Sequence, residues 1–286
     1  MSKKKIVLCI IAALCVIAVI IGISAKRAAD RNKPTENKVE SIISTDLAQN
    51  KDLKLIAHRG LNAIAPENTV PAYQRAGEAG YWGAECDVFR TADGKWVLHH
   101  DADTKRMTNG NLKIEKSKYE ELRKLDIDNG NGLDTYTDVK IATLDEYLDV
   151  CQSLGMIPVI ELKSENNTEY YNEITEAVKK RKLNAQYISF YEDDLRAIKK
   201  LDDKAQLFLL VDKIDDDAVN FAKELGNCGV SFNAGNKKNL KNKGAAIKKI
   251  TDAKIPAAAW TVDDIETIQT LVDCGVLYIT TDCITY

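Results

Sequence analysis

Short apolar runs alternate with longer amphipathic stretches through residues 51–286, and this alternation restricts the chain to α/β folds. Eight runs have strand character: Leu53–His58, Gly83–Val88, Ile157–Leu162, Gln186–Phe190, Gln206–Val211, Gly229–Phe232, Pro256–Trp260 and Val276–Thr280. Between most of them lie stretches of helical periodicity, several of which end at Gly, a common helix stop. Eight such repeats in about 235 residues predict a (β/α)8 TIM barrel. A doubly wound open sheet is the alternative, but its Gly-rich first turn is missing from the sequence.

One long segment breaks the repeat. Nearly 70 residues separate the second predicted strand from Ile157, and we predict that about 89–142 form an insertion after that strand. It begins with a predicted hairpin, because Asp93-Gly94 is a strong turn signal between FRTA and KWVLHH. It leads into a helix predicted over Thr143–Leu154. The chain ends four residues after Asp282, too early for a full eighth helix, so residues 36–48 are a candidate cover for that gap.

The N-terminal segment has the pattern of a membrane anchor. Residues Ile6–Ala25 carry no charge, and as a helix they would span about 30 Å, the thickness of the hydrocarbon core. Lys3–Lys5 precede them, which predicts a cytoplasmic N-terminus. We therefore predict a single-pass transmembrane helix within residues 1–25, a polar linker over 26–50, and an extracytoplasmic barrel domain held at the cell membrane. A cleaved signal peptide, which would give a secreted protein, remains the alternative.

Charge and cysteine content exclude several classes of protein. The net charge is −3, and acidic groups outnumber basic ones within residues 51–286, so nucleic acid is not an expected partner. Five cysteines fall in the same part, an odd number at wide spacing. They fit small buried hydrophobes better than a disulfide framework or a zinc site. Nothing in the sequence indicates an obligate protein partner.

Acidic side chains gather at the predicted C-terminal ends of two strands, where barrel enzymes carry their active sites. Glu85 and Asp87 are two residues apart, so both point to one face of their strand, and Glu161 and Lys163 share that relation. Three carboxylates inside a barrel would repel one another unless a hard divalent cation held them. The sequence therefore predicts a divalent-cation site, with solvent-facing strand ends as the alternative.

All three histidines fall within 43 residues, close to this acidic set. His58 follows the first strand, and His99 and His100 end the predicted hairpin, where adjacent side chains face opposite ways. One of that pair can therefore join His58 as an acid/base couple, but the alternation does not say which. Together with Arg59, Lys163 and a divalent cation, two histidines suit attack on a phosphate ester.

The segments that carry these residues resemble the glycerophosphodiester phosphodiesterase family. The matching text is AHRGLNAIAPENTVPAYQRA, GAECDVFRTADGKWVLHHDADTKRMTNG, VKIATLDEYLDVC, VIELK, AAAWTV and YITTD. The resemblance implies a (β/α)8 barrel with an insertion after the second strand. It also implies metal-dependent hydrolysis of glycerophosphodiesters to an alcohol and glycerol 3-phosphate, with one Ca²⁺ or Mg²⁺ as cofactor.

The resemblance also implies a role for each matching residue. His58 and His100 are the acid/base pair, since the HD motif of the family falls on His100-Asp101 and selects His100 over His99. The implied metal ligands are Glu85, Asp87 and Glu161. Arg59 and Lys163 contact phosphate. Glu67 hydrogen-bonds substrate, or else is an ordinary acid at a helix N-terminus. Trp260 packs against the glycerol moiety, or else belongs to the core.

Two rival functions remain open at this point. Related barrels cleave lipid phosphodiesters in the manner of phospholipases C and D, although the sequence shows no long exposed apolar segment for entering a bilayer. A catalytically silent surface module that binds phosphodiester polymers is the other possibility. The intact set of two histidines and three carboxylates argues against it.

Overall fold

The structure is a computed structural model that describes residues 42–43, 47–163, 167–235 and 237–286. The predicted membrane segment Ile6–Ala25 and most of the linker over 26–50 lie outside these described residues. Within the described ranges, no helix is both long enough and apolar enough to cross a membrane.

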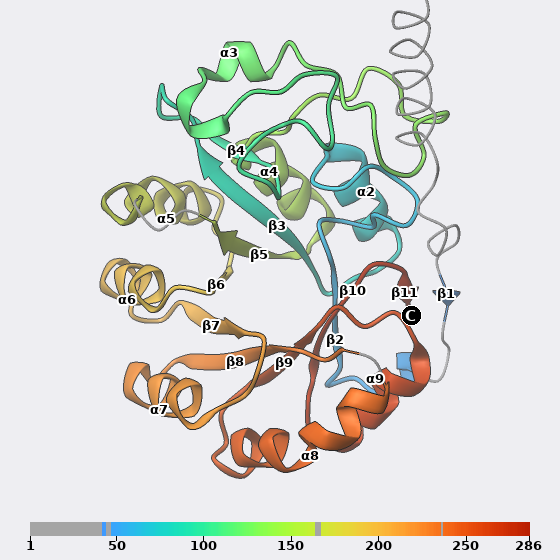
Figure 1. Ribbon diagram of the computed structural model, residues 1–286, viewed down its shortest axis with the longest axis vertical. Helices are drawn as coiled ribbons and strands as arrows, with labels where there is room; N and C mark the ends of the chain where they lie inside the picture. The colour runs from blue at the N-terminus through green and yellow to red at the C-terminus, as the bar shows by residue number, and fades with distance from the viewer. Residues whose placement is uncertain (1–41, 44–46, 164–166, 236) are drawn as a thin grey trace, which may run out of the picture.

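Eight parallel strands close into a barrel (Figure 1). They are β2 (Lys54–Ala57), β3 (Gly83–Arg90), β5 (Ile157–Leu162), β6 (Gln186–Ser189), β7 (Gln206–Val211), β8 (Cys228–Asn233), β9 (Ala257–Trp260) and β10 (Tyr278–Thr281). The last strand pairs with the first, with Tyr278 opposite Lys54, and β2 also pairs with β3, which closes the sheet. The predicted (β/α)8 barrel is therefore confirmed, and the open sheet is excluded. Each predicted strand is present, with its ends displaced by at most two residues.

Helices surround the barrel on its outside (Figure 1). They are α2 (Val70–Glu78), α4 (Leu144–Leu154), α5 (Tyr171–Lys180), α6 (Glu192–Leu201), α7 (Asp216–Leu225), α8 (Lys237–Asp252) and α9 (Ile265–Asp273). Helix α4 begins where predicted, because Thr143 accepts a hydrogen bond from the Glu146 backbone while the Glu146 side chain bonds back to Thr143. It ends at Gly155, which has the left-handed φ of +71° that glycine adopts without strain.

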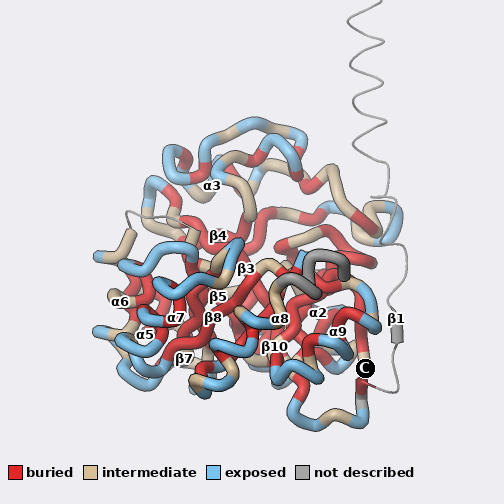
Figure 2. Tube along the Cα trace, turned by 60° about the horizontal axis from the view of Figure 1, so that its bottom comes forward, coloured by how far each residue is buried: buried red, intermediate tan, exposed pale blue. Residues whose placement is uncertain are grey.

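Alternation along the strands divides the core into two layers. Val159 belongs to the small apolar cluster inside the barrel, whereas Ile160 packs in the larger cluster between strands and helices. Cys86 lies in that outer layer, as its position between Glu85 and Asp87 predicts. Figure 2 shows the same division, with buried strands enclosed by helices whose outer faces are exposed. Of the five cysteines in the described residues, all are free and only Cys274 is exposed.

The insertion leaves the barrel at the C-terminal end of β3. Strand β4 (Trp96–Leu98) pairs antiparallel with β3, with Arg90 opposite Trp96, so the predicted hairpin is present. The segment continues through η2 (Ile114–Lys116) and α3 (Tyr119–Leu122) and has its own buried apolar cluster, distinct from the barrel core. In Figure 1 it forms the part of the molecule around α3, beyond the ends of β3 and β4.

The chain end is joined to residues from the predicted linker. Strand β1 (Ile42–Ile43) pairs in parallel with β11 (Ile284–Thr285), and the 3-10 helix η1 (Leu47–Gln49) places Leu47 in the core. Residues 42–43 therefore pair with the C-terminal segment and Leu47 packs in the barrel core, whereas residues 36–41 and 44–46 lie outside the described residues. The hydroxyl of Tyr286 also donates to the Leu53 carbonyl at 2.8 Å.

Candidate active site

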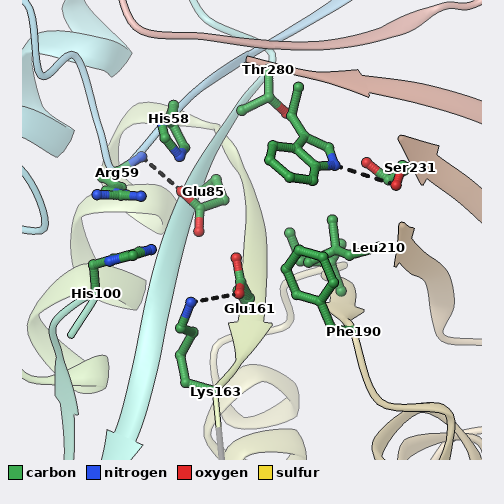
Figure 3. Close-up of a pocket in the computed structure, with 12 residues that line it drawn as sticks. His58, Arg59, Glu85, His100, Glu161, Lys163, Phe190, Leu210, Ser231 and Thr280 are labelled. Carbon is green, nitrogen blue, oxygen red and sulfur yellow. Dashed lines mark hydrogen bonds and ion pairs between the residues drawn. The ribbon is translucent and has the colours of Figure 1, made fainter. Parts of the chain in front are cut away.

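A pocket of about 210 Å³ lies at the C-terminal ends of the strands (Figure 3). Its lining residues are His58, Arg59, Glu85, His100, Glu161, Lys163, Ile188, Phe190, Leu210, Ser231, Trp260 and Thr280. Figure 3 shows the ionisable side chains gathered across one half of the pocket, with Phe190 and Leu210 in the other half. The pocket therefore has a charged side and an apolar side.

Three carboxylates converge beneath the charged side. Glu85 and Asp87 come from β3 and Glu161 from β5, and the strand register places Asp87 directly opposite Glu161. One oxygen from each carboxylate lies within 4.8 Å of the other two. Glu85 and Asp87 are only 2% and 1% exposed. The interior orientation predicted for the three acids is therefore observed.

Burial and mutual repulsion strongly perturb these acids. Burial raises the pKa of Glu85 well above its usual range, and the charges of Asp87 and Glu161 raise it further. Burial, followed by the charge of Asp87, raises the pKa of Glu161 to about 7. Burial alone would also raise the pKa of Asp87, but the charges of Arg59 and Lys163 outweigh it and lower that pKa. Positive charge between the carboxylates would relieve this conflict.

The carboxylates fit a hard divalent cation. Glu85 Oε1 and Asp87 Oδ1 are buried and have no hydrogen-bond partner among the described residues. Unpartnered buried oxygens are costly unless something else binds them. Oxygen ligands of this kind suit Ca²⁺ or Mg²⁺. The described residues therefore include one acidic triad able to hold a metal ion, the set predicted from the sequence.

Two cations border the triad. The backbone N–H of Arg59 donates to Glu85 Oε2 at 2.8 Å, and Arg59 Nε lies 3.4 Å from Asp87 Oδ2. Lys163 Nζ donates to Glu161 Oε1 at 2.8 Å and lies 3.4 Å from Asp87 Oδ1. Both side chains also line the pocket. They are therefore positioned to contact an anion placed next to the carboxylates.

Each of the two pocket histidines bonds a carboxylate through Nδ1. His58 Nδ1 lies 2.8 Å from Asp282 Oδ1, and His100 Nδ1 lies 2.8 Å from Asp101 Oδ1. A carboxylate on one ring nitrogen fixes the orientation of the imidazole and selects its tautomer. Both rings therefore enter the pocket in a defined orientation, one from β2 and one from the insertion.

His99 lies outside the pocket. It is buried, and its Nδ1 lies 2.9 Å from the Asp101 carbonyl oxygen and 3.1 Å from the Asp101 backbone nitrogen. Burial lowers the pKa of His99 and so favours the neutral ring. Of the two adjacent histidines, the structure thus places His100 in the pocket, the residue that the HD motif selects.

Glu67 and Trp260 occupy different surroundings. Glu67 bonds Arg59 at 3.0 Å and Arg106 at 2.6 Å, and it lines a second pocket of about 130 Å³ next to the first. Burial alone would raise the pKa of Glu67, but its bonds to Arg106 and Arg59 lower that pKa to about 2. Trp260 lies on the apolar side of the first pocket, edge-on to Phe190 with ring centroids 5.8 Å apart.

Three polar residues that support the site were not predicted from the sequence. Asp282 holds His58, and Arg106 bonds both Glu67 and Asp101. Asn68 donates to Asp87 Oδ2 at 2.7 Å and receives a bond from the Tyr73 hydroxyl at 2.9 Å. All three lie inside segments that carry the family resemblance, which was the available signal. Nothing in the spacing of Arg106 indicates its partners.

Fold and site together define a (β/α)8 barrel with an acidic, histidine-bearing rim at the C-terminal ends of its strands. The sequence pattern of the glycerophosphoryl diester phosphodiesterase family matches residues 58–285, and the chain belongs to this family. The resemblance noted in the sequence is therefore confirmed.

Comparison with individual proteins agrees with this assignment. The chain is 35% identical over 162 residues to a glycerophosphodiester phosphodiesterase of Caldanaerobacter subterraneus, a match that covers 54% of this chain and 65% of the relative. It is 34% identical over 129 residues to human glycerophosphodiester phosphodiesterase 1, covering 45% of this chain and 38% of the relative. These matches thus span less than two thirds of either relative.

Solved structures extend the similarity over more of the chain. An Oleispira antarctica phosphodiesterase, solved in complex with the product sn-glycerol-3-phosphate, has a TM-score of 0.70 at 28% identity, covering 80% of this chain and 92% of that one. A glycerophosphodiester phosphodiesterase from Parabacteroides distasonis has a TM-score of 0.65 at 28% identity, covering 85% and 94%. The similarity thus covers at least 80% of this chain and more than nine tenths of each of these two structures.

Proposed function

We propose that this chain hydrolyses glycerophosphodiesters to an alcohol and glycerol 3-phosphate. The observation that carries the proposal is the convergence of three carboxylates, two of them buried, with two carboxylate-bonded histidines and two cations at one pocket. Family membership and the similarity to a phosphodiesterase solved with sn-glycerol-3-phosphate support the same reaction and substrate class.

The proposed chemistry depends on one divalent cation, Ca²⁺ or Mg²⁺, held by Glu85, Asp87 and Glu161. Such an ion supplies positive charge that stabilises the phosphate oxygens in the transition state. Arg59 and Lys163 add two further charges at the same rim, and both line the pocket. Charge stabilisation of this kind is a large part of the catalysis of phosphoryl transfer.

The two histidines divide the proton transfers in this proposal. His58 bonds Asp282 through Nδ1, so its Nε2 is the nitrogen that takes a proton from the attacking water. His100, whose Nδ1 is held by Asp101, protonates the departing alkoxide oxygen through Nε2. Trp260 and Phe190 form the apolar surface against which the glycerol carbons pack.

An assay of the purified full-length protein tests this function. Glycerophosphocholine, glycerophosphoethanolamine and glycerophosphoglycerol are supplied separately, and glycerol 3-phosphate is measured with an enzyme-coupled readout. We expect release of glycerol 3-phosphate that stops with excess chelator and resumes on adding Ca²⁺ or Mg²⁺. Release of glycerol together with the phosphorylated alcohol would contradict the proposed products. A lysophospholipid is supplied in parallel, and its cleavage without cleavage of the three glycerophosphodiesters would favour the rival lipid phosphodiesterase.

We also propose that Ile6–Ala25 anchors the chain in the cell membrane with the barrel outside. The support is the uncharged run and the lysines before it, since these residues lie outside the described part of the structure. Protease added to intact cells should release an active fragment. Complete protection of the barrel until the cells are lysed would reverse the proposed orientation.

A further inference from the structure

Arg106 lies between two carboxylates beside the pocket. Its Nε donates to Asp101 Oδ2 at 2.6 Å, while Nη2 and Nη1 donate to Glu67 Oε1 and Oε2 at 2.6 and 3.1 Å. Arg106 belongs to the insertion, and Glu67 belongs to the segment between β2 and α2. One guanidinium thus joins two parts of the chain that come together at the rim.

Each carboxylate held by Arg106 in turn holds a pocket residue. The second oxygen of Asp101 lies 2.8 Å from His100 Nδ1. Glu67 accepts a bond from Arg59 Nη1 at 3.0 Å. His100 and Arg59 both line the pocket. Arg106 is therefore linked to the proposed acid, His100, through Asp101. It is linked separately, through Glu67, to the proposed phosphate contact Arg59. We call these links the Asp101 branch and the Glu67 branch.

From this geometry we infer that Arg106 is a positioning residue, which fixes His100 and Arg59 in one relative arrangement through Asp101 and Glu67. The inference rests on the proposed function, since it concerns the same reaction. A planar guanidinium can bond two carboxylates at fixed angles, whereas a lysine offers a single ammonium. Without that fork, Asp101 and Glu67 keep only their bonds to His100 and Arg59, and both pairs gain rotational freedom.

The two branches predict two separable kinetic effects. Loss of the Asp101 branch disorders His100, so it should lower kcat. Loss of the Glu67 branch disorders Arg59, so it should raise KM. Arg106→Ala should do both, with kcat falling roughly 10–100-fold, the scale on which misplaced catalytic groups lose activity. Asp101→Asn should reproduce mainly the kcat effect and Glu67→Gln mainly the KM effect.

Arg123 provides a matched control within the insertion. Its guanidinium also bonds a carboxylate, Glu146 Oε1 at 2.9 Å, and it bonds the Ile141 carbonyl at 2.7 Å. Its side chain is 38% exposed, close to the 40% of Arg106, and neither of its partners lines the pocket. Arg123→Ala should therefore lower the melting temperature about as much as Arg106→Ala while leaving kcat and KM within about twofold.

A double-mutant cycle with His100→Ala separates positioning from general destabilisation. If Arg106 acts through His100, Arg106→Ala should lower kcat far less in the His100→Ala protein than in wild type, while the KM effect persists. Calorimetric binding of inorganic phosphate requires no turnover. It should weaken in Arg106→Ala and Glu67→Gln but not in Asp101→Asn, whatever the substrate proves to be.

Arg106→Lys provides a second test if Arg106→Ala does not fold, because lysine keeps the positive charge and can form one of the hydrogen bonds. It should retain the wild-type melting temperature and show an intermediate kcat. Equal activity losses in Arg106→Ala and Arg123→Ala would overturn the inference. So would a double variant in which Arg106→Ala lowers kcat by the same factor in the His100→Ala protein as in wild type. A wild-type protein inactive on glycerophosphodiesters would contradict the proposed function instead, and phosphate binding would still test Arg106.

Discussion

His58 Nδ1 lies 2.8 Å from Asp282 Oδ1, although the two residues are 224 positions apart in the sequence. His58 directly follows the first barrel strand and Asp282 directly follows the last, and β10 pairs with β2. Closure of the barrel thus creates the pair. Asn62 also donates to Asp282, and the Asp282 backbone N–H donates to Asp263 Oδ1 at 2.7 Å. The side chain of Asp282 is therefore held by Asn62 and its backbone by Asp263.

Asp282→Asn should lower kcat about 100-fold or more with little change in fold, because the amide keeps the shape of the side chain but not its charge. An amide in this position can present N–H to Nδ1 and so select the wrong tautomer of His58. Steady-state kinetics with a glycerophosphodiester, together with circular dichroism, measure the effect. Wild-type turnover in this variant would show that the pair does not orient the base.

The metal-free protein should lose stability as the pH rises toward neutrality. The pKa of Glu161 is about 7 in the folded protein against an ordinary value of 4.5, so the folded state binds this proton more tightly than the unfolded state. The resulting stabilisation is complete below pH 4.5 and is lost as the pH rises to about 7, by up to about 3 kcal/mol. Melting temperatures in chelator at several pH values measure it.

Glu161→Gln is the matched variant for that measurement. It removes one of three closely spaced carboxylates, so in chelator at pH 8 it should be more stable than wild type and should show a weaker pH dependence. Ca²⁺ or Mg²⁺ should raise the melting temperature of wild type, and most strongly at pH 8, but should have little effect on the variant. Equal stabilisation of both proteins by the ion would place the metal site elsewhere.

The strand pattern predicted the arrangement of the acidic residues, because side chains alternate along a strand. ECDV carries the acids Glu85 and Asp87 at alternate positions, and IELK carries Glu161 and Lys163 in the same relation. Once the two strands pair in register, the three acids must meet inside the barrel. The residues that hold these acids and histidines in place could not be predicted in this way. Asp282 reaches His58 through barrel closure, and Asn68 reaches Asp87 from a backbone with φ of +55°. Arg106 lies in a long irregular loop, where neither helical nor strand periodicity predicts the direction of a side chain.

His100→Ala should lower kcat roughly 10²–10⁴-fold, the usual contribution of one acid–base group. His99→Gln is the control, since His99 is buried outside the pocket. That variant should lower the melting temperature, because a buried side chain is changed, but leave kcat near that of wild type. With a p-nitrophenyl leaving group, which needs no protonation, the His100→Ala defect should shrink. An undiminished defect would exchange the roles proposed for His100 and His58.

The apolar side of the pocket offers the most selective test of substrate binding. Phe190 lines the pocket and packs edge-on against Trp260, yet it is 42% exposed, so removing its ring should cost little stability. Phe190→Ala should raise KM about 3–10-fold at nearly constant kcat, the loss expected when one ring contact of about 1 kcal/mol is removed. Tyr191 is the matched control, because it is the next residue, is 39% exposed and does not line the pocket. Tyr191→Ala should therefore leave KM unchanged. A KM increase of the same size in both variants would mean that the loop after β6 acts through its conformation, and that Phe190 makes no contact with the glycerol carbons.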